Sequence, residues 1–456
     1  MVLSKKVKRI HFVGIGGVGM SGIAEVMHNM GFDITGSDLK KSEITVYLES
    51  LGIKISYGHS PENVKGAEVI VISTAIPENN PEVTAAKEKG IPVIKRAEML
   101  AELMRMKYSV AVSGAHGKTT TTSMIAAIME TAGLDPTVVV GGKIIGARSG
   151  AKLGRSDYLI AEADESDMSF LKLFPTVAVI TNIDEEHLDT YQNFENIKKA
   201  FVEFANKVPF YGCVILNLDN EGVREIMGFI KRRKITYGLT RQAEIEARNI
   251  ELENMGSRFS IYYRGKKAVD VHLNVLGVHN ILNALASFTT GLELDIPPLV
   301  IKEGLENFRG VGRRFEIKGS KNGVIVVDDY GHHPNEILTT LETARKFHDG
   351  RIVVVFQPHR YTRTYYLHEK FGPVFLNADV LVITEIYPAG EKPIEGITAE
   401  LIYNAVKKSG HRDVYYIPKT KDIIKFLHET LRKGDLLLTL GAGNIYKIGE
   451  RILEDT

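Results

Sequence analysis

Several residue types that define whole classes of protein are scarce or absent in this chain. Its 456 residues include no tryptophan and a single cysteine, Cys213. One cysteine cannot form a disulfide within the chain, which excludes a disulfide-based fold and fits a reducing, cytoplasmic environment. The 57 basic and 56 acidic residues nearly cancel. The overall charge therefore gives no reason to expect nucleic acid or an anionic membrane surface as a partner.

Long apolar runs are scarce too. Residues 10–20 follow a basic N-terminal stretch, as in a signal peptide, but glycines interrupt them and a helical pattern follows. We therefore predict a strand and a loop at this position, and no targeting or membrane-spanning segment in the chain. A chain of this length is expected to hold two to four domains.

What the chain does contain is a phosphate-binding pattern. Between a strand predicted from residue 108 and a helix predicted to about residue 129 lies the turn Gly114-Ala115-His116-Gly117-Lys118-Thr119-Thr120. Gly114 and Gly117 allow backbone N–H groups to converge on one anion, the helix N-terminus adds a positive dipole, and Lys118 adds a full charge. Thr119 can offer its hydroxyl to Mg²⁺. The match to G-x-x-x-x-G-K-[ST] is incomplete, because Val112 stands where the first glycine is expected.

A second glycine pattern lies near the start of the chain. Residues 8–13 predict a strand, and Gly14, Gly16 and Gly19 have the spacing of a Rossmann-like turn before a helix. Asp38, about 20 residues further on, stands where an acid commonly holds a ribose hydroxyl. The pattern predicts a nucleotide site, for which NAD is the default ligand of an isolated match.

Three more polar residues follow strands of the same predicted domain. Ser73 and Thr74 end one strand, at the edge where open parallel sheets bind ligands. His59 follows another strand and is compatible with the same edge or with an ordinary surface loop.

Two polar clusters follow predicted strands beside the phosphate-binding turn. Residues 162–167 hold four carboxylates after a strand at 157–161, and residues 181–189 follow a strand at 177–180 and include His187. Because the carboxyl ends of parallel strands share one edge, these clusters favour a magnesium site over a merely solvated loop. Glu162 is the first acid of the run.

The remainder of the chain changes character twice. Residues 235–274 alternate apolar and polar side chains and predict a small antiparallel sheet. The helix that follows places Asn280 and Asn283 on one face, where they suit an adenine, a ribose or ordinary capping. Beyond residue 311, strands alternate with helices again, and their ends carry histidine and arginine where the middle region carries carboxylates.

These patterns predict an α/β protein with three domains. The first is a Rossmann-like N-terminal domain at residues 1–106. The second, at residues 107–311, is a P-loop central ATPase domain with a parallel sheet and a small antiparallel sheet. The third is a Rossmann-like C-terminal domain at residues 312–456.

Eight motifs, in the same order, resemble those of the Mur ligases, and within them the branch that adds L-alanine to UDP-N-acetylmuramate. The resemblance covers nearly the whole chain. The motifs lie at residues 14–20, 114–121, 162–167, 181–187, 279–284, 312–315, 328–334 and 357–363. The resemblance implies ATP-driven amide formation through an acyl phosphate, with the UDP-sugar, ATP and the amino acid bound mainly by the first, second and third domains.

The resemblance also implies a role for individual residues. Those implied to bind ATP are Gly114, Ala115, His116, Gly117, Lys118, Thr119, Thr120, Asn280, Asn283, Arg314 and Tyr330. Those implied to bind the UDP-sugar are Gly16, Gly17, Val18, Gly19, Met20, Asp38, His59, Ser73 and Thr74. Those implied to bind the lactoyl group and the amino acid are His332, His359, Arg360 and Arg363.

Catalysis and metal binding are implied for an overlapping set. The implied catalytic residues are Lys118, His187, His359 and Arg360, and the implied ligands of two magnesium ions are Thr119, Glu162 and His187. Several sister ligases carry a carbamylated lysine shortly after the histidine, and here that place falls near Phe201. This difference agrees with the alanine-adding branch and leaves the second ion with fewer implied ligands.

Other functions remain open at the level of sequence. A ligase that joins a whole tripeptide to the same UDP-sugar would share these motifs and differ in its acceptor pocket. An NAD-dependent oxidoreductase would use the first glycine pattern and Asp38, but it would leave Lys118, Glu162 and His187 unexplained.

Overall fold

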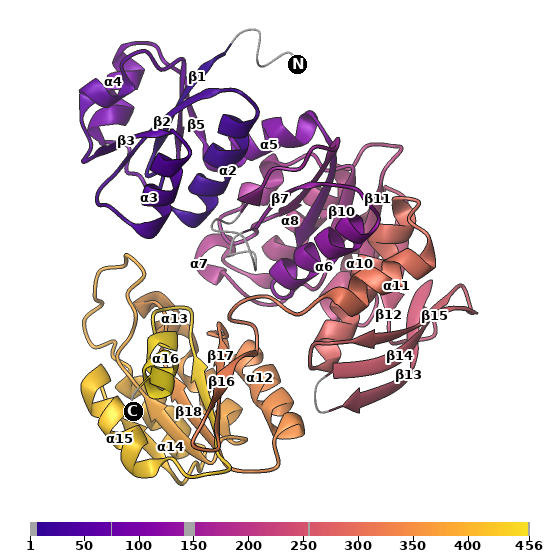
Figure 1. Ribbon diagram of the computed structural model, residues 1–456, viewed down its shortest axis with the longest axis vertical. Coiled ribbons are helices and arrows are strands. Elements are labelled where there is room, and N and C mark those ends of the chain that lie inside the picture. Colours follow the sequence, from indigo (N-terminus) through magenta and orange to yellow (C-terminus); the bar gives the residue numbers. More distant parts are fainter. Residues whose placement is uncertain (1–6, 74, 141–150, 254–255, 455–456) are drawn as a thin grey trace. The chain divides into compact units, whose positions relative to one another are not determined.

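The computed structural model describes residues 7–73, 75–140, 151–253 and 256–454. The described residues form an α/β protein with three sheets (Figure 1), as the sequence predicts. Apart from two short segments, the chain divides into one compact unit that runs to Arg309 and another that begins at Gly310. The first unit contains the first two sheets, and the second unit contains the third. No described helix has the length and apolar character that crossing a membrane requires.

The first sheet has the strand order of a Rossmann fold, β3-β2-β1-β4-β5, with all strands parallel. Its strands are β1 (Arg9–Val13), β2 (Asp33–Asp38), β3 (Lys54–Tyr57), β4 (Val69–Ile72) and β5 (Val93–Lys95). The helices between them are α2 (Val18–Asn29), α3 (Glu43–Ser50), η1 (Pro61–Val64), α4 (Pro81–Glu88) and α5 (Arg96–Arg105). The glycine turn at residues 14–17 joins β1 to α2, as predicted.

The second sheet has ten strands in the order β15-β14-β13-β12-β11-β10-β6-β9-β7-β8. They are β6 (Tyr108–Ser113), β7 (Thr137–Val139), β8 (Ala151–Lys152), β9 (Tyr158–Glu162), β10 (Val177–Ile180), β11 (Cys213–Asn217), β12 (Lys234–Gly238), β13 (Ile245–Glu253), β14 (Gly256–Tyr263) and β15 (Lys266–Leu273). The predicted antiparallel segment is present, with β14 antiparallel to β15. It continues the parallel sheet, because β13 pairs in parallel with β12.

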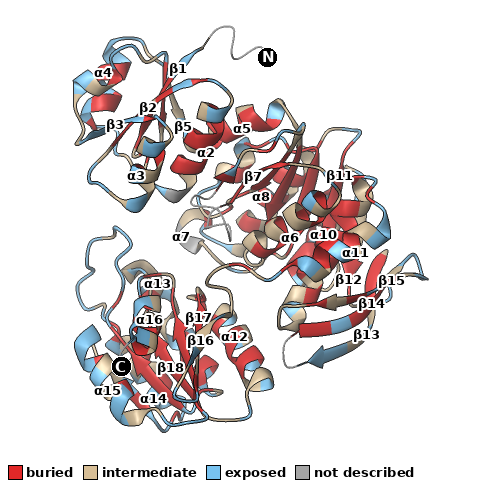
Figure 2. Cartoon of the chain, in the orientation of Figure 1, coloured by how far each residue is buried: buried red, intermediate tan, exposed pale blue. Residues whose placement is uncertain are grey.

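Helices cover this second sheet, and the strands beneath them are apolar because they are buried. They are α6 (Lys118–Thr131), η2 (Ser169–Lys172), α7 (Leu188–Tyr191), α8 (Phe194–Asn206), α9 (Glu221–Ile226), η3 (Met227–Phe229), α10 (Val278–Glu293) and α11 (Pro298–Asn307). Phe201 and Phe204 of α8 share one buried cluster with Ala178 and Val214 of the sheet, while α6 packs against α10 and α11. Strands β10 and β11 are buried along their whole length (Figure 2), as parallel strands covered on both faces should be.

The third sheet has a different order, β16-β17-β21-β18-β19-β20. Its strands are β16 (Glu316–Lys321), β17 (Val324–Asp329), β18 (Ile352–Phe356), β19 (Val380–Ile383), β20 (Val414–Tyr416) and β21 (Leu436–Leu440). Its helices are α12 (Pro334–Phe347), α13 (Tyr361–Leu367), η4 (His368–Phe371), η5 (Pro373–Phe375), α14 (Glu400–Lys408), α15 (Thr420–Thr430) and α16 (Tyr446–Glu454). Strand β21 pairs in parallel with both β17 and β18, and β16 is antiparallel to β17.

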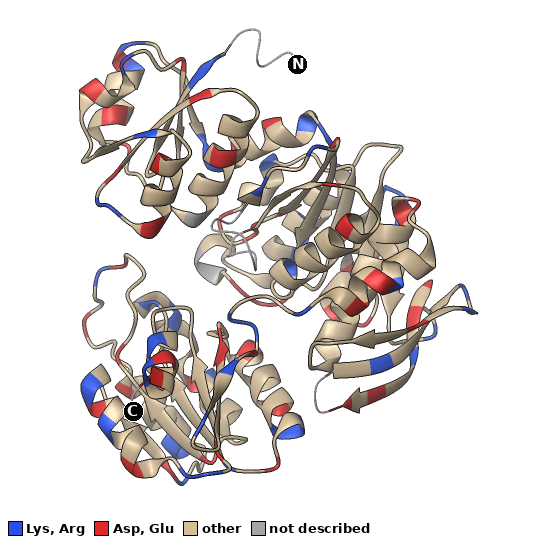
Figure 3. Cartoon of the chain, in the orientation of Figure 1, with Lys and Arg blue, Asp and Glu red and all other residues tan. Residues whose placement is uncertain are grey.

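Basic and acidic residues are both spread over the described elements of the three sheets (Figure 3). This mixing agrees with the near-zero net charge of the chain. Charge of one sign is concentrated at the ends of some strands, as in residues 162–167 at and after the end of β9. Those strand ends are where the candidate sites lie.

Candidate functional site

The phosphate-binding turn requires glycine at two positions. Gly114 and Gly117 have φ angles of +138° and +82°, which side chains disfavour. A Cβ atom at Gly114 would lie 2.1 Å from Thr181 Oγ1, and one at Gly117 would lie 2.5 Å from Asn283 Oδ1. The backbone of the turn is therefore packed tightly between the loop after β10 and the helix α10. Helix α6 begins immediately after Gly117, at Lys118.

Hydrogen bonds join this turn to the loop after β10. The N–H of His116 donates to Asn182 Oδ1 at 2.8 Å. The carbonyl of His116 accepts from Thr181 Oγ1 at 2.6 Å and from Asn182 Nδ2 at 2.9 Å. Because β10 pairs with β6, the two strand ends that the sequence singled out do lie together, as predicted.

Lys118 lies among carboxylates. Its Nζ is 2.9 Å from Glu165 Oε1 and donates to the carbonyl oxygens of Gly114 and Ala115. Burial by itself lowers the pKa of Lys118, but the charges of Glu165, Asp164 and Glu162 outweigh burial and raise it. The lysine is therefore positively charged at the mouth of the phosphate-binding turn.

Glu165 is a member of the predicted acidic run that we did not single out from the sequence. Its side chain is 4% exposed, and Oε1 contacts both Lys118 and, at 3.6 Å, His187 Nε2. Its Oε2 has no hydrogen-bond partner among the residues that the structure describes. Its backbone is fixed by Tyr191, whose hydroxyl donates to the Glu165 carbonyl at 2.6 Å. Only the folded loop after β9 reveals which acid of the run faces the lysine.

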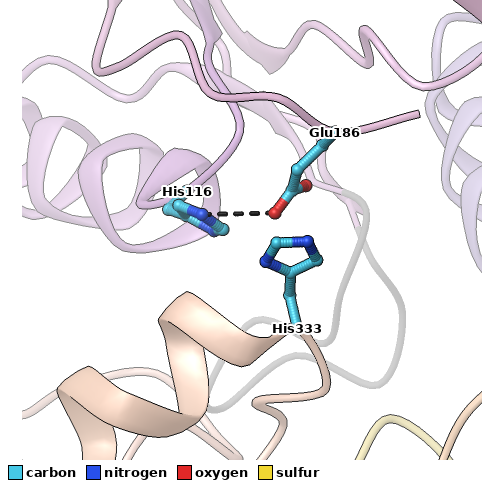
Figure 4. Close-up of side chains that lie close together, drawn as sticks. All are labelled: His116, Glu186 and His333. Atoms are coloured by element: carbon cyan, nitrogen blue, oxygen red, sulfur yellow. Dashed lines mark ion pairs between the residues drawn. The ribbon is translucent and has the colours of Figure 1, made fainter. Parts of the chain in front are cut away.

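His116 of the phosphate-binding turn and three residues after β10, Asp184, Glu186 and His187, complete this cluster. His116 Nε2 lies 3.2 Å from Glu186 Oε1 (Figure 4) and 3.3 Å from Asp184 Oδ2. His187, with a φ angle of +56°, places Nε2 3.6 Å from Glu186 Oε2. Glu186 was also not singled out from the sequence, although it precedes His187 directly.

The donor set fits a magnesium ion. Thr119 lies in the first turn of α6, and Glu162 ends β9, paired with Val112 of β6. Carboxylate and hydroxyl oxygens are the ligands that Mg²⁺ prefers. A buried carboxylate oxygen without a hydrogen-bond partner, Glu165 Oε2, is the kind of atom that a cation can satisfy. His187 would add an imidazole nitrogen.

The predicted asparagine pair lies on α10 behind the phosphate-binding turn. Asn283 is buried, its Oδ1 accepts from Thr121 Oγ1 at 3.2 Å, and its Nδ2 donates to Asn280 Oδ1 at 3.1 Å. Together with its closeness to Gly117, this bonding gives Asn283 a direct part in shaping the turn. Contact of either asparagine with ATP stays a prediction.

The glycine turn of the first sheet is built on β2. Gly14 has a φ angle of +77°, and its N–H and that of Ile15 donate to the Ser37 carbonyl at 2.8 and 2.9 Å. The N–H of Gly16 donates to Asp38 Oδ2 at 2.8 Å. Asp38 is therefore already engaged in holding the turn, in addition to the ribose contact predicted for it.

Other predicted UDP-sugar residues lie at the same edge. Gly19 is the second residue of α2 and lies beside Arg96, whose Nη1 would be 3.1 Å from a Cβ at this glycine, while the Met20 side chain is buried in the core. Gly17 precedes α2 in extended conformation, Ser73 follows β4, and only the backbone of Val18 is described. Thr74 lies outside the described residues.

His59 does not have the environment of an ordinary surface histidine. Its side chain is 12% exposed, with Nδ1 at 3.3 Å from Ser37 Oγ and 3.5 Å from Glu82 Oε1. Ser37 directly precedes Asp38 at the end of β2. The structure therefore brings His59 to the edge that carries the glycine turn.

Aromatic and histidine rings gather at the strand ends of the second unit. The His332 ring lies 5.5 Å from the rings of both Tyr330 and His359. His359 stacks on Tyr387 at 5.6 Å, and its Nδ1 is 3.2 Å from Arg363 Nη1. Tyr387 was not predicted, because it follows β19 in a loop without a motif.

Both histidines of this cluster are held neutral. Burial and the charges of Arg363 and Arg360 lower the pKa of His359 to about 4. Burial lowers the pKa of His332 to about 3, against the opposing charge of Glu336. Neutral imidazoles can accept as well as donate hydrogen bonds, which suits contact with carboxylate and hydroxyl groups.

The arginines of the second unit have separate roles. Arg313 Nε is 2.9 Å from Asp328 Oδ2, and its guanidinium also donates to the carbonyls of Gly441 and Gly443, so it holds the sheet together. The guanidinium of Arg314 lies 5.3 Å from the Tyr330 ring. Arg360 is exposed at the start of α13, with a φ angle of +73°.

Comparison with known proteins gives matches along the whole chain. The profile described as the Mur ligase family catalytic domain matches residues 9–108, that of the Mur ligase middle domain residues 112–291, and that of the Mur ligase glutamate ligase domain residues 313–443. The UDP-N-acetylmuramate–L-alanine ligase of Geotalea daltonii is 54% identical over 449 residues, which are 98% of both chains. The enzyme of the same name from Geobacter sulfurreducens is 52% identical over 98% of this chain and 97% of its own.

Solved structures agree with these matches. The UDP-N-acetylmuramate–alanine ligase of Thermotoga maritima aligns with a TM-score of 0.83 at 30% identity, over 98% of both chains. A murein peptide ligase from Psychrobacter arcticus aligns with a TM-score of 0.73 over 98% of both chains. At 23% identity, this second likeness shows the fold alone.

Proposed function

This chain belongs to the Mur ligase family, and we propose that it joins L-alanine to the lactoyl carboxylate of UDP-N-acetylmuramate at the expense of ATP, in peptidoglycan precursor synthesis. The observation that carries the proposal is the end-to-end similarity to enzymes of that activity. The first glycine turn then needs no NAD, because it lies in a domain that matches this ligase family. A cytoplasmic location, where ATP and the sugar nucleotide are available, follows from the same proposal.

The reaction has two steps. A carboxylate oxygen of the lactoyl group attacks the γ-phosphorus of ATP, the bond from that phosphorus to ADP breaks, and an acyl phosphate forms. The amine of L-alanine then attacks the acyl carbon, phosphate leaves, and the amine loses a proton. Phosphorylation is needed because a free carboxylate is a poor acylating group.

Lys118 and the backbone of the turn would carry the first step. Two anions must approach each other, so positioned positive charge and backbone N–H groups lower the barrier. Lys118 is held by Glu165 and by the carbonyls of the turn, which keep its charge close to the site of the β- and γ-phosphates. Binding of ATP would exchange some of these contacts for phosphate oxygens.

We propose magnesium sites at Thr119, Glu162 and His187, with Glu165 as an added oxygen ligand or as the partner that orients Lys118. When bound, magnesium would neutralise charge on the transferring phosphoryl group. The residues themselves fix the geometry: Glu165 contacts both Lys118 and His187, and Glu186 contacts both His187 and His116.

The second unit would bind the acceptor. The pair of neutral rings at His332 and His359, with Arg363 beside them, can bind a carboxylate and hydroxyl groups. Arg360 adds an exposed positive charge next to this cluster. Tyr330, with Arg314 against its ring, offers a flat surface suited to the adenine of ATP.

The proposal is tested by phosphate release from ATP and Mg²⁺ with UDP-N-acetylmuramate and a choice of acceptors. Release that depends on L-alanine is expected, with glycine and L-serine as weaker acceptors to compare. Release only with the tripeptide L-alanyl-γ-D-glutamyl-meso-diaminopimelate would assign the chain to the peptide-adding ligases. The absence of release with every acceptor would contradict ligase function and favour a non-catalytic nucleotide-binding protein.

A further inference from the structure

Glu82, in the first turn of α4, is a fully buried carboxylate behind the glycine turn of the first sheet. Its Oε2 accepts from Ser37 Oγ at 2.6 Å, and its Oε1 accepts from Asn63 Nδ2 at 2.5 Å. Its Oε1 also lies 3.5 Å from His59 Nδ1, and its Oε2 lies 3.5 Å from His11 Nε2. One carboxylate thus contacts β1, β2 and the loop from β3 to η1.

The carboxylate is charged despite its burial. Desolvation raises the pKa of Glu82, but the neighbouring His11 and the hydrogen bonds from Ser37 and Asn63 lower it to about 2. A buried charge is costly, and an apolar side chain of similar size would often stabilise a core at least as well. We therefore explain the buried carboxylate of Glu82 by its effect on the positions of the groups around it.

Ser37 connects this carboxylate to the glycine turn. Its hydroxyl donates to Glu82, while its backbone carbonyl accepts from the N–H groups of Gly14 and Ile15. The same residue thus links the buried charge to the turn that is expected to face a phosphate. A shift of Ser37 would move both.

Ser37 also determines which ring nitrogen of His59 carries the proton. The hydroxyl has one proton, and the 2.6 Å bond directs it to Glu82, so the 3.3 Å contact with His59 requires a proton on Nδ1. In the neutral ring Nε2 is then an acceptor. His59 would therefore accept a hydrogen bond from a donor such as a ribose hydroxyl or the imide N–H of uracil.

We propose that Glu82 is a positioning residue of the UDP-sugar site, which it serves by fixing Ser37 and the orientation and tautomer of His59. The inference rests on the proposed function only for the identity of the ligand. Glu82 itself is too deeply buried to touch that ligand, so its effect must pass through the residues that it holds.

The test is calorimetric titration of the full chain with UDP-N-acetylmuramate and, separately, with Mg²⁺-ATP. We expect Glu82→Gln to weaken binding of the UDP-sugar about tenfold or more, as loss of a charged buried hydrogen-bond acceptor does, with ATP affinity unchanged. The matched control is Glu25→Gln, since Glu25 is another buried carboxylate of this domain, and it accepts from the Tyr47 hydroxyl at 2.8 Å. It should leave both affinities unchanged.

A second variant keeps the inference testable if Glu82→Gln unfolds. His59→Ala removes a side chain that is partly exposed, unlike that of Glu82, and should also weaken binding of the UDP-sugar. In the double variant the loss should not exceed that of the more affected single variant, because both act on one path. Unchanged affinity in His59→Ala, additive losses, or equal losses for ATP and the UDP-sugar would overturn the inference. Failure of the unaltered protein to bind UDP-N-acetylmuramate would instead contradict the proposed ligand.

Discussion

The chain contains two strand–glycine turn–helix motifs, and they place their charges differently. The turn of the first sheet has the buried carboxylate of Glu82 behind it, Asp38 accepting from its Gly16 N–H, and no lysine at the start of its helix. The turn of the second sheet has Lys118 at the start of its helix and Glu165, Glu186 and His187 around it. In both, glycines with positive φ bring the backbone close to a neighbouring loop.

This difference in charge placement fits one turn that binds a ligand and another that takes part in the reaction. A turn that only holds an anion can rely on backbone N–H groups and on a scaffold of fixed polar contacts. A turn that must bring a carboxylate to a phosphate needs positive charge held at the reacting atoms and carboxylates that place it. The buried charge in one turn and the accessible charge in the other fit these two tasks.

The largest effect should come from Lys118→Ala. Removal of this charge should lower the rate of phosphate release by about 10²-fold or more, because residues 114–120 hold no other lysine or arginine. The affinity for UDP-N-acetylmuramate, measured by calorimetry, should be unchanged. A collapse of that affinity would show that the two turns are not separate in function.

A smaller effect is expected from Glu165→Gln. The isosteric change removes the charge that faces Lys118 and His187, so kcat should fall about tenfold, with little change in thermal stability. Steady-state kinetics measures this effect. Asp167→Asn is the matched control, since Asp167 is an exposed acid of the same run that accepts from the Ser169 N–H. Equal losses in both variants would mean that the acidic run acts only through its overall charge.

A matched glycine pair sharpens the comparison further. Gly117→Ala places a Cβ at positive φ and 2.5 Å from Asn283 Oδ1, and should cost about 1–2 kcal/mol of stability and weaken ATP binding. Gly19→Ala meets the end of the Arg96 side chain at 3.1 Å, which can move, and should weaken UDP-sugar binding slightly. Thermal unfolding and titration of each ligand would measure both. A greater loss for Gly19→Ala would reverse the assignment of the tighter turn.

The smallest expected effect is on the stability of the protein in acid. It compares Glu82 of the first unit with His359 of the second. The pKa of His359 is lowered to about 4, so between its ordinary pKa of about 6.5 and 4 the unfolded chain takes up a proton first and acid favours unfolding. The pKa of Glu82 is lowered to about 2, so its stabilisation is complete above about 4.5 and is lost only below that. His359→Gln should therefore lose less stability than the unaltered chain from pH 7 to pH 5, by about 1 kcal/mol in urea unfolding, whereas Glu82→Gln should lose as much as the unaltered chain. The reverse pattern would contradict both shifts.

Much of the fold could be predicted because its signals are local. A glycine turn between an apolar strand and a helix is encoded in a few adjacent residues, and both turns lie where the sequence places them. Polar clusters at the ends of neighbouring parallel strands likewise meet at one edge. Lys118, His187 and the loop after β10 were found in this way.

The remaining parts depend on contacts between residues far apart in the sequence. Glu165 could not be chosen from four nearby acids, because the choice is made by the path of the loop after β9 and by its bond to Tyr191. Glu82 lies 45 residues from Ser37, and nothing in its own segment indicates a buried charge. The place of β21 in the third sheet is likewise determined by pairing and not by the pattern of β21 itself.

That last strand has a consequence for synthesis on the ribosome. In the first sheet, β1 can pair with β2 as soon as both have emerged, and later strands extend the sheet outward. In the third sheet β21 lies between β17 and β18, so these two strands cannot be joined into one sheet until residues 436–440 have left the exit tunnel. The second unit therefore cannot finish folding even when most of its residues have been synthesised. Until then it exposes apolar strands that the finished sheet would cover. Chaperone dependence during translation should accordingly be greatest for this part of the chain.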